Sequence, residues 1–302
     1  MPPLSLRKRP GRAALLAGSC LLALACASGG HSAASGAVSP RLAGPAGRRV
    51  HYEVFGKGEP ALVFVHGWSC DMTFWDEQTP HFAARHRVVL IDLPGHGRSE
   101  VPEGELSMDV FADAIDAVLR DVKIPAAVLV GHSMGTPVIR QFYRRYPGKT
   151  LALVAVDGAL RPFSKDPKAG EGFLGPLRGD GYLPAFTKMV NGMTAPVPDE
   201  RKRERIRKAM LATPQSVVVR AGDGMFDSRI WGDDPIRVPL LVVSAKSSGW
   251  PSDYEAWVRT LAPRARYVEM EGVSHFLMMD DPAKFNGLLD SFLDTELSNR
   301  SR

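Results

Sequence analysis

The chain has 302 residues, 44% of them hydrophobic and 24% charged, which fits one large globular domain or a domain with an inserted module. Its 38 basic and 33 acidic side chains give a formal charge of +5, which at first points to nucleic acid or an anionic surface. Four of the cations lie in the first 25 residues, which contain no acid, so the rest of the chain holds 34 basic and 33 acidic side chains. This nearly neutral body argues against a nucleic-acid partner.

The first 25 residues have the layout of a secretory signal peptide. A basic run that ends at Arg12 is followed by an acid-free stretch rich in Leu and Ala, 13–25, and then by small residues around Cys26. This stretch is shorter than the roughly 20 residues that a membrane-spanning helix needs. We therefore expect residues 1–25 to be removed on export across the cytoplasmic membrane.

Cys26 leaves two forms of the exported protein open. Ala23-Leu24-Ala25 is an A-x-A cleavage site that would release a secreted or periplasmic protein. Cys26 itself resembles the lipid-modified cysteine of bacterial lipoproteins, which would attach the chain to a membrane. Residues 26–47 are dominated by Ser, Ala, Gly and Pro and predict a flexible tether, because they offer too little apolar surface to fold.

Short apolar runs and helical patterns alternate along residues 48–297. Because continuous apolar strands separated by helices are typical of a sheet covered on both faces, we expect an α/β fold with a mostly parallel central sheet. Ser107 and Asp281 are expected to cap two of the helices, and residues 298–302 form the expected C-terminal tail. The predicted strands are 50–55, 61–65, 87–92, 127–131, 151–156, 238–244 and 265–270, and the predicted helices are 108–121, 134–146, 253–262 and 282–296.

Residues 160–236 interrupt this alternation. They contain no comparable strand, and they form a connection far longer than the roughly 12 residues of an ordinary loop. We therefore expect an inserted helical cap between two parts of the core, 48–159 and 237–297. Its basic run, 201–208, is read as the solvated face of an amphipathic helix. Apolar residues of the insert either line a hydrophobic pocket or pack its own core: Phe163, Phe173, Leu183, Phe186 and Met189.

Ser133 is the candidate nucleophile. It lies in Gly131-His132-Ser133-Met134-Gly135, directly after a predicted strand and before a predicted helix. This is the setting of a G-x-S-x-G nucleophile elbow, whose glycines permit a tight turn that exposes the hydroxyl. The helix N-terminus that follows favours a developing negative charge.

Two further segments complete a candidate site at the carboxyl ends of the strands. His66-Gly67-Trp68 follows strand 61–65, so the backbone N–H groups of Trp68 and of Met134 are the expected oxyanion hole, and His66 is expected to fix the turn. His275 follows strand 265–270 and is the candidate general base, because a serine hydroxyl needs a neighbouring base to become a nucleophile.

Four motifs together resemble the α/β-hydrolase superfamily over about residues 48–297: HGW at 66, DLPGHGRS at 92, GHSMG at 131 and GVSH at 272. The resemblance implies an α/β-hydrolase fold and a serine esterase or lipase-like activity. In that family the acid of the triad commonly stands where this chain has Ser248, and the turn 245–249 contains no carboxylate.

Two aspartates are candidates for the missing acid. Asp157 directly follows strand 151–156, a position that some members of the family use, and it keeps the chain order Ser, Asp, His. Asp253 lies in Ser252-Asp253-Tyr254-Glu255, which is a capping box and has a helix-starting role of its own. The sequence favours Asp157 and leaves open both Asp253 and a site without an acid.

The predicted function is hydrolysis of a carboxylic ester through an acyl-enzyme on Ser133, with no cofactor or metal, because neither an H-E-x-x-H pattern nor a phosphate loop occurs. The family also includes haloalkane dehalogenases and epoxide hydrolases, which carry a carboxylate where this chain has Ser133, so the serine argues against both activities. Thioesterase, amidase, carbon-carbon hydrolase and haloperoxidase-like activities share the serine triad. A catalytically silent, surface-tethered binding protein is the alternative from another class, and the oligomeric state is left open.

Overall fold

The computed structural model describes residues 41–297 except 163, 165 and 167, so the expected signal peptide, most of the tether and the C-terminal tail lie outside the described residues. A single sheet of eight strands runs through this part of the chain, in the order β1-β2-β4-β3-β5-β6-β7-β8. The strands are β1 (Arg41–Ala43), β2 (Val50–Phe55), β3 (Ala61–Val65), β4 (Val88–Ile91), β5 (Ala127–His132), β6 (Thr150–Val156), β7 (Leu240–Ala245) and β8 (Arg266–Met270).

The sheet is mostly parallel, as the sequence predicts. Only β2 pairs antiparallel, with β1 on one side and β4 on the other, while β4, β3, β5, β6, β7 and β8 run parallel to their neighbours. Every residue of β3, β4, β5 and β7 is buried. These strands are predominantly apolar because helices exclude water from both of their faces.

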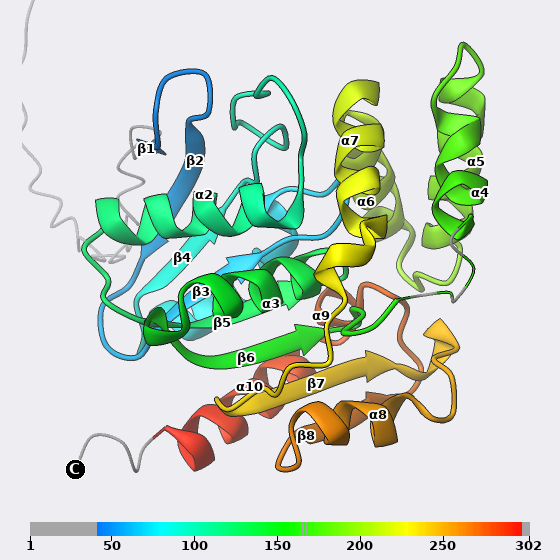
Figure 1. Cartoon of the computed structure of the whole chain (residues 1–302). Helices are drawn as coiled ribbons and strands as arrows, with labels where there is room; N and C mark the ends of the chain where they lie inside the picture. Colours follow the sequence, from blue (N-terminus) through cyan, green and yellow to red (C-terminus); the bar gives the residue numbers. More distant parts are fainter. Residues whose placement is uncertain (1–40, 163, 165, 167, 298–302) are drawn as a thin grey trace, which may run out of the picture. The chain divides into compact units, whose positions relative to one another are not determined.

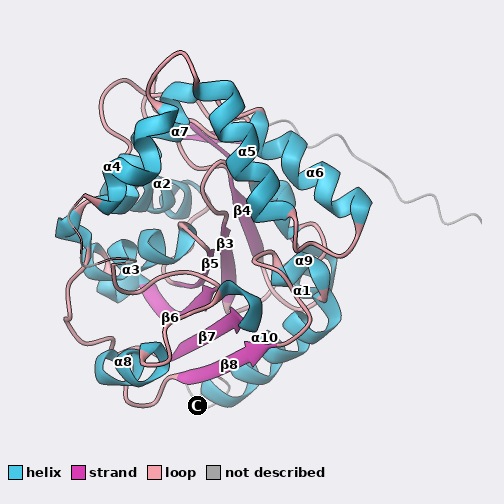
Figure 2. Cartoon of the chain, turned by 90° about the vertical axis from the view of Figure 1, so that its right-hand side faces the viewer, coloured by secondary structure: helices cyan, strands magenta, loops and turns pink. Residues whose placement is uncertain are grey.

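Helices cover the two faces of the sheet. Figure 2 shows α2, α3 and α8 on one face and α1 and α10 on the other. The expected caps are confirmed: the side chain of Ser107 accepts from the Val110 N–H and that of Asp281 from the Lys284 N–H. The helices are α1 (Thr79–Ala83), α2 (Met108–Asp121), α3 (Gly135–Arg145), α8 (Tyr254–Leu261), α9 (Leu277–Asp280) and α10 (Pro282–Glu296), with short 3-10 turns η1 (Met72–Trp75), η2 (Pro147–Lys149), η3 (Gly175–Leu177), η4 (Ser228–Ile230) and η5 (Lys246–Ser248).

The insert between β6 and β7 is helical, as expected. Its helices are α4 (Ala169–Leu174), α5 (Tyr182–Thr194), α6 (Glu200–Leu211) and α7 (Gln215–Phe226). They lie on the side to which the arrows of β6 and β7 point, so this cap stands over the carboxyl edge of the sheet (Figure 1). Phe186 is fully buried and Met189 packs against the core, Phe173 lines a cavity, and Leu183 is 60% exposed. Phe163 lies outside the described residues. No helix within the described part of the chain combines the length and the hydropathy needed to cross a bilayer.

The predicted tether, 26–47, extends too far, because three of its residues form the strand β1. Arg41–Ala43, inside the expected tether 26–47, pairs antiparallel with β2, and Ala43 is buried. Backbone hydrogen bonds to an available sheet edge hold this strand, while Leu42 is 41% exposed. A composition argument cannot detect such a strand, because the pairing requires few apolar side chains.

Candidate active site

Ser133 occupies a strained turn between β5 and α3. Its φ is 52°, in the left-handed region that side chains other than glycine rarely adopt, and its N–H donates to the Val156 carbonyl at 2.9 Å. A Cβ on Gly131 would lie 2.3 Å from the Gly135 oxygen, and a Cβ on Gly135 would lie 2.5 Å from the Val65 oxygen. Both glycines are therefore required for the close approach that positions the serine.

Asp157 and His275 form a hydrogen-bonded pair beside this turn. Asp157 follows the last residue of β6 with a φ of 43°, and its Oδ2 lies 2.7 Å from the Nδ1 of His275. The carboxylate is fully buried, and the imidazole is 25% exposed. Asp253 instead forms an ion pair with Arg161 at 2.6 Å, and its side chain is 69% exposed. The structure thus brings Asp157, and not Asp253, to the histidine.

The loop after β7 supplies donors to Asp157 in place of a carboxylate. The Ala245 N–H and the Trp250 Nε1–H donate to Oδ1, each at 2.9 Å, and the Ser248 hydroxyl donates to Oδ2. Burial alone would raise the pKa of Asp157, but the hydrogen bond and charge of His275, together with the donors Ser248 and Trp250, hold that pKa below its ordinary value. The carboxylate is therefore ionised at neutral pH and fixed in one orientation.

The expected oxyanion turn packs against the serine. A Cβ on Gly67 would lie 3.1 Å from the Ser133 Cβ, so only a glycine lets the backbone of the turn come this close. Trp68 and Met134 are both buried. Met134 directly follows Ser133 in the chain, and Trp68 lines the same cavity as Ser133. The His66 Nδ1–H donates to the Gly67 carbonyl at 2.8 Å, and its Nε2 accepts from the Leu93 N–H at 3.0 Å. Because both ring nitrogens are used for backbone contacts, His66 fixes the turn, as predicted.

His132 is a neighbour of the site that sequence reasoning did not single out. Its Nε2 lies 2.8 Å from the His275 carbonyl oxygen, and the two rings are 4.7 Å apart. Since a carbonyl can only accept, the imidazole carries its proton on Nε2. Burial, together with the nearby charge of His275, lowers the pKa of His132 to about 3, which keeps the ring neutral. The position of His132 within the G-H-S-M-G pattern was the available signal for this contact.

Ser133, Asp157 and His275 line one cavity of about 670 Å³. Its wall is largely apolar and combines the core with the cap. From the core come Trp68, Trp250, Pro251 and Tyr254, and from the insert come Pro162, Phe173, Met193, Pro196, Met225 and Phe226. A cavity of this size and character suits a small organic molecule with an apolar group.

Comparisons with known proteins find esterases and a lactone-degrading enzyme among the similar proteins. A pimeloyl-(acyl-carrier protein) methyl ester esterase from Aeromonas hydrophila is 29% identical over 261 residues, which cover 81% of this chain and 99% of that protein. A thermophilic esterase from Thermogutta terrifontis superposes with a TM-score of 0.74 at 25% identity, over 85% of this chain and 98% of that one. An N-acyl homoserine lactone degrading enzyme superposes with a TM-score of 0.67 at 26% identity, over 83% and 100%.

A comparison with protein-family models identifies the family of this chain. Residues 62–288, most of the chain, match the model of the alpha/beta hydrolase family. The strand order, the turn at Ser133 and the helical insert over the carboxyl edge are in keeping with that match. The protein therefore belongs to the alpha/beta hydrolase family, and it is esterase-like.

Proposed function

We propose that the protein is a serine hydrolase that cleaves a carboxylic ester through an acyl-enzyme on Ser133. The observation that carries this proposal is the pair of His275 with the buried Asp157, 2.7 Å between Nδ1 and Oδ2, in the cavity that Ser133 also lines. The esterases among the similar proteins support the same reaction class. We favour catalysis over a silent binding protein, because Asp157 beside His275 can supply the acid whose absence was the one argument for that alternative.

The proposed reaction has two halves. Nε2 of His275 takes the proton of the Ser133 hydroxyl while the oxygen attacks the ester carbonyl, and the N–H groups of Trp68 and Met134 stabilise the oxyanion. The tetrahedral intermediate then expels the alcohol, to which His275 returns the proton. Water, deprotonated by the same histidine, attacks the acyl-enzyme, and His275 returns that proton to the Ser133 oxygen as the carboxylic acid is released. Asp157 keeps the proton of His275 on Nδ1 throughout and stabilises the imidazolium.

We propose that the substrate has an apolar acyl or alcohol group. The cavity that Ser133 lines carries aromatic side chains from core and cap, among them Trp68, Phe173 and Trp250, and few charged ones. Burying one methylene contributes about 0.8 kcal/mol, which is close to a 4-fold change in kcat/KM. The thioesterase, amidase and other serine-triad activities remain alternatives within the same chemistry.

A chain-length series of p-nitrophenyl esters tests this proposal. From acetate through butyrate to hexanoate we expect kcat/KM to rise about 4-fold per methylene until the cavity is filled. Steady-state rates measured with the wild-type protein give the values. Equal rates along the series would remove the hydrophobic subsite, and an absence of hydrolysis of every ester would contradict the esterase assignment.

We also propose that the protein is exported and carries a lipid on Cys26, on the sequence pattern alone. Metabolic labelling of producing cells with a radioactive fatty acid is the test. We expect label in the wild-type protein and none in Cys26→Ser. Label retained in Cys26→Ser would contradict lipidation at this cysteine, and an unlabelled wild-type protein found outside the membrane fraction would favour the freely secreted form.

A further inference from the structure

The turn Gly67–Cys70 lies between the nucleophile and the cap. On its inner side, a Cβ on Gly67 would come within 3.1 Å of the Ser133 Cβ and of the His132 Nδ1, so the backbone of the turn is packed on the elbow. The next residue, Trp68, supplies one of the two N–H groups expected to bind the oxyanion. Small displacements of this backbone therefore change the distance between that donor and the reacting carbonyl.

The side chain of Trp68 is held by the cap. Its Nε1–H donates to the carbonyl of Val218 in α7 at 2.8 Å. Its ring centroid lies 5.5 Å from that of Phe173 in α4 and 5.5 Å from that of Phe186 in α5. The indole is 4% exposed. One side chain from the core thus contacts three helices of the cap, while its backbone belongs to the oxyanion turn.

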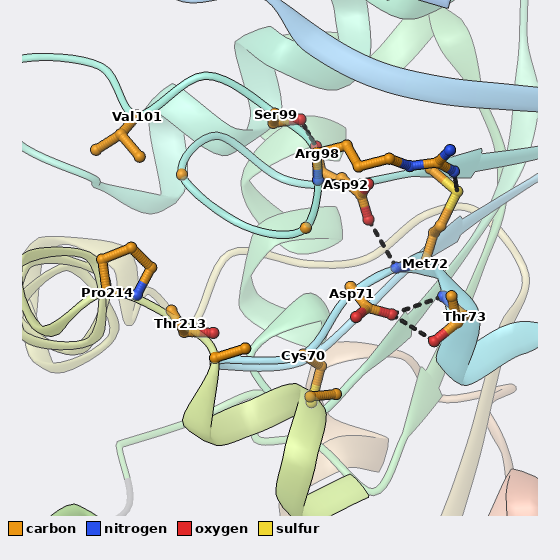
Figure 3. Close-up of a pocket in the computed structure, with 14 residues that line it drawn as sticks. Cys70, Asp71, Met72, Thr73, Asp92, Arg98, Ser99, Val101, Thr213 and Pro214 are labelled. Carbon is orange, nitrogen blue, oxygen red and sulfur yellow. Dashed lines mark hydrogen bonds between the residues drawn. The ribbon is translucent and has the colours of Figure 1, made fainter. Parts of the chain in front are cut away.

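A second contact joins the next residue of the turn to the cap. The hydroxyl of Thr213, in the connection between α6 and α7, donates to the carbonyl of Ser69 at 3.2 Å. Both side chains are buried, and Ser69 has a φ of 58°, which shows that the turn is held in a strained conformation. Figure 3 shows Cys70 of the turn and Thr213 and Pro214 of the cap among the residues that line a neighbouring cavity of about 500 Å³.

We propose that Trp68, through its indole, and Thr213 are positioning residues that make the geometry of the oxyanion hole depend on the place of the cap. Two consecutive residues of the turn are hydrogen-bonded to the cap, so a shift of α7 is transmitted to the N–H of Trp68. Trp68 and Phe173 also line the substrate cavity, so an apolar group bound there presses on the same contact. This inference rests on the proposed esterase function, because only that function gives the turn an oxyanion to bind.

Two mild variants and one matched control test the inference in the full-length protein. Trp68→Phe keeps an aromatic ring but removes the Nε1–H, and Thr213→Val keeps the volume but removes the hydroxyl. The control is Arg220→Gln. Arg220 lies in α7, as Val218 does, but its guanidinium donates to the carbonyls of Pro102 and Gly104, at 2.8 and 2.7 Å, and not to the turn.

We expect kcat for p-nitrophenyl butyrate to fall about 10-fold to 100-fold in Trp68→Phe, and by a smaller factor in Thr213→Val, with KM changed by less than about 3-fold. A trifluoromethyl ketone, whose adduct with Ser133 carries an oxyanion, should bind more weakly by the same factors as kcat falls. The matching secondary alcohol, which cannot form the adduct, should bind unchanged. Arg220→Gln should keep kcat within about 2-fold of the wild-type value.

With an active wild-type protein, three results would overturn the inference and leave the esterase function intact. The first is an unchanged kcat in both Trp68→Phe and Thr213→Val, and the second is a rise in KM in these variants without a fall in kcat. The third is a fall in kcat in Arg220→Gln as large as in the two variants. If Trp68→Phe does not fold, as judged by circular dichroism, Thr213→Val decides. An inactive wild-type protein whose Ser133 does not react with the ketone would instead overturn the proposed function, and the inference with it.

Discussion

Replacing Asp157 with asparagine should lower kcat for ester hydrolysis about 10⁴-fold, the scale on which a Ser-His-Asp triad depends on its carboxylate. Asp157 is the buried partner of the His275 Nδ1–H. An asparagine can turn its NH₂ group toward Nδ1, which favours the tautomer with the proton on Nε2, so that Nε2 cannot accept the serine proton. The neutral amide also lacks the negative charge that stabilises the imidazolium. The rate is measured with p-nitrophenyl butyrate, and circular dichroism with thermal unfolding shows whether the variant is folded.

Asp253→Asn is the matched control for this experiment. Its carboxylate is 69% exposed and bonded to Arg161, so its replacement should change kcat by less than about 3-fold. The reverse pattern, a large loss in Asp253→Asn with little change in Asp157→Asn, would transfer the role of the acid to Asp253. Equal small effects would mean that the reaction uses no acid of this kind.

Ser133→Ala should lower kcat by about 10⁶-fold, because no other side chain can form the acyl-enzyme. The variant should fold, since the bond from residue 133 to Val156 uses the backbone N–H and the side chain is shortened by one atom. We expect a melting temperature within a few degrees of the wild type, measured in the same buffer as the kinetics. A folded Ser133→Ala protein that keeps a tenth of the wild-type rate would exclude the proposed mechanism.

The strands and helices of the fold were predictable because burial requires apolar side chains at regular positions in the local sequence. The run 61–65 predicts β3 and the amphipathic pattern 108–121 predicts α2, and both agree with the structure to the residue. Asp157 could be chosen for a similar reason, since a carboxylate directly after a buried strand must lie at the carboxyl edge.

Contacts between distant segments could not be predicted in the same way. Ser248 and Trp250 lie 91 and 93 residues from the Asp157 that they hold, and no local pattern marks them as its donors. The predicted capping box at Ser252 is not formed: the N-cap of α8 is Asp253, whose side chain makes no cap bond to the helix and is paired with Arg161.

The contact between core and cap is a further example. Trp68 and Val218 are 150 residues apart, and the pattern HGW at 66 identifies only the backbone role of the tryptophan. The place of its indole depends on how α7 packs over the carboxyl edge of the sheet. Tertiary packing alone therefore determines whether the cap and the oxyanion turn are joined.

Reaction of the wild-type protein with a fluorophosphonate, followed by mass spectrometry of its peptides, tests the central claim most directly. Only a serine activated by a neighbouring base reacts readily with such a reagent. We predict one covalent adduct, located on Ser133, with labelling that is slowed strongly in Asp157→Asn and unchanged in Asp253→Asn. An unlabelled protein, or an adduct on any other residue, would contradict the assignment of Ser133 as the nucleophile.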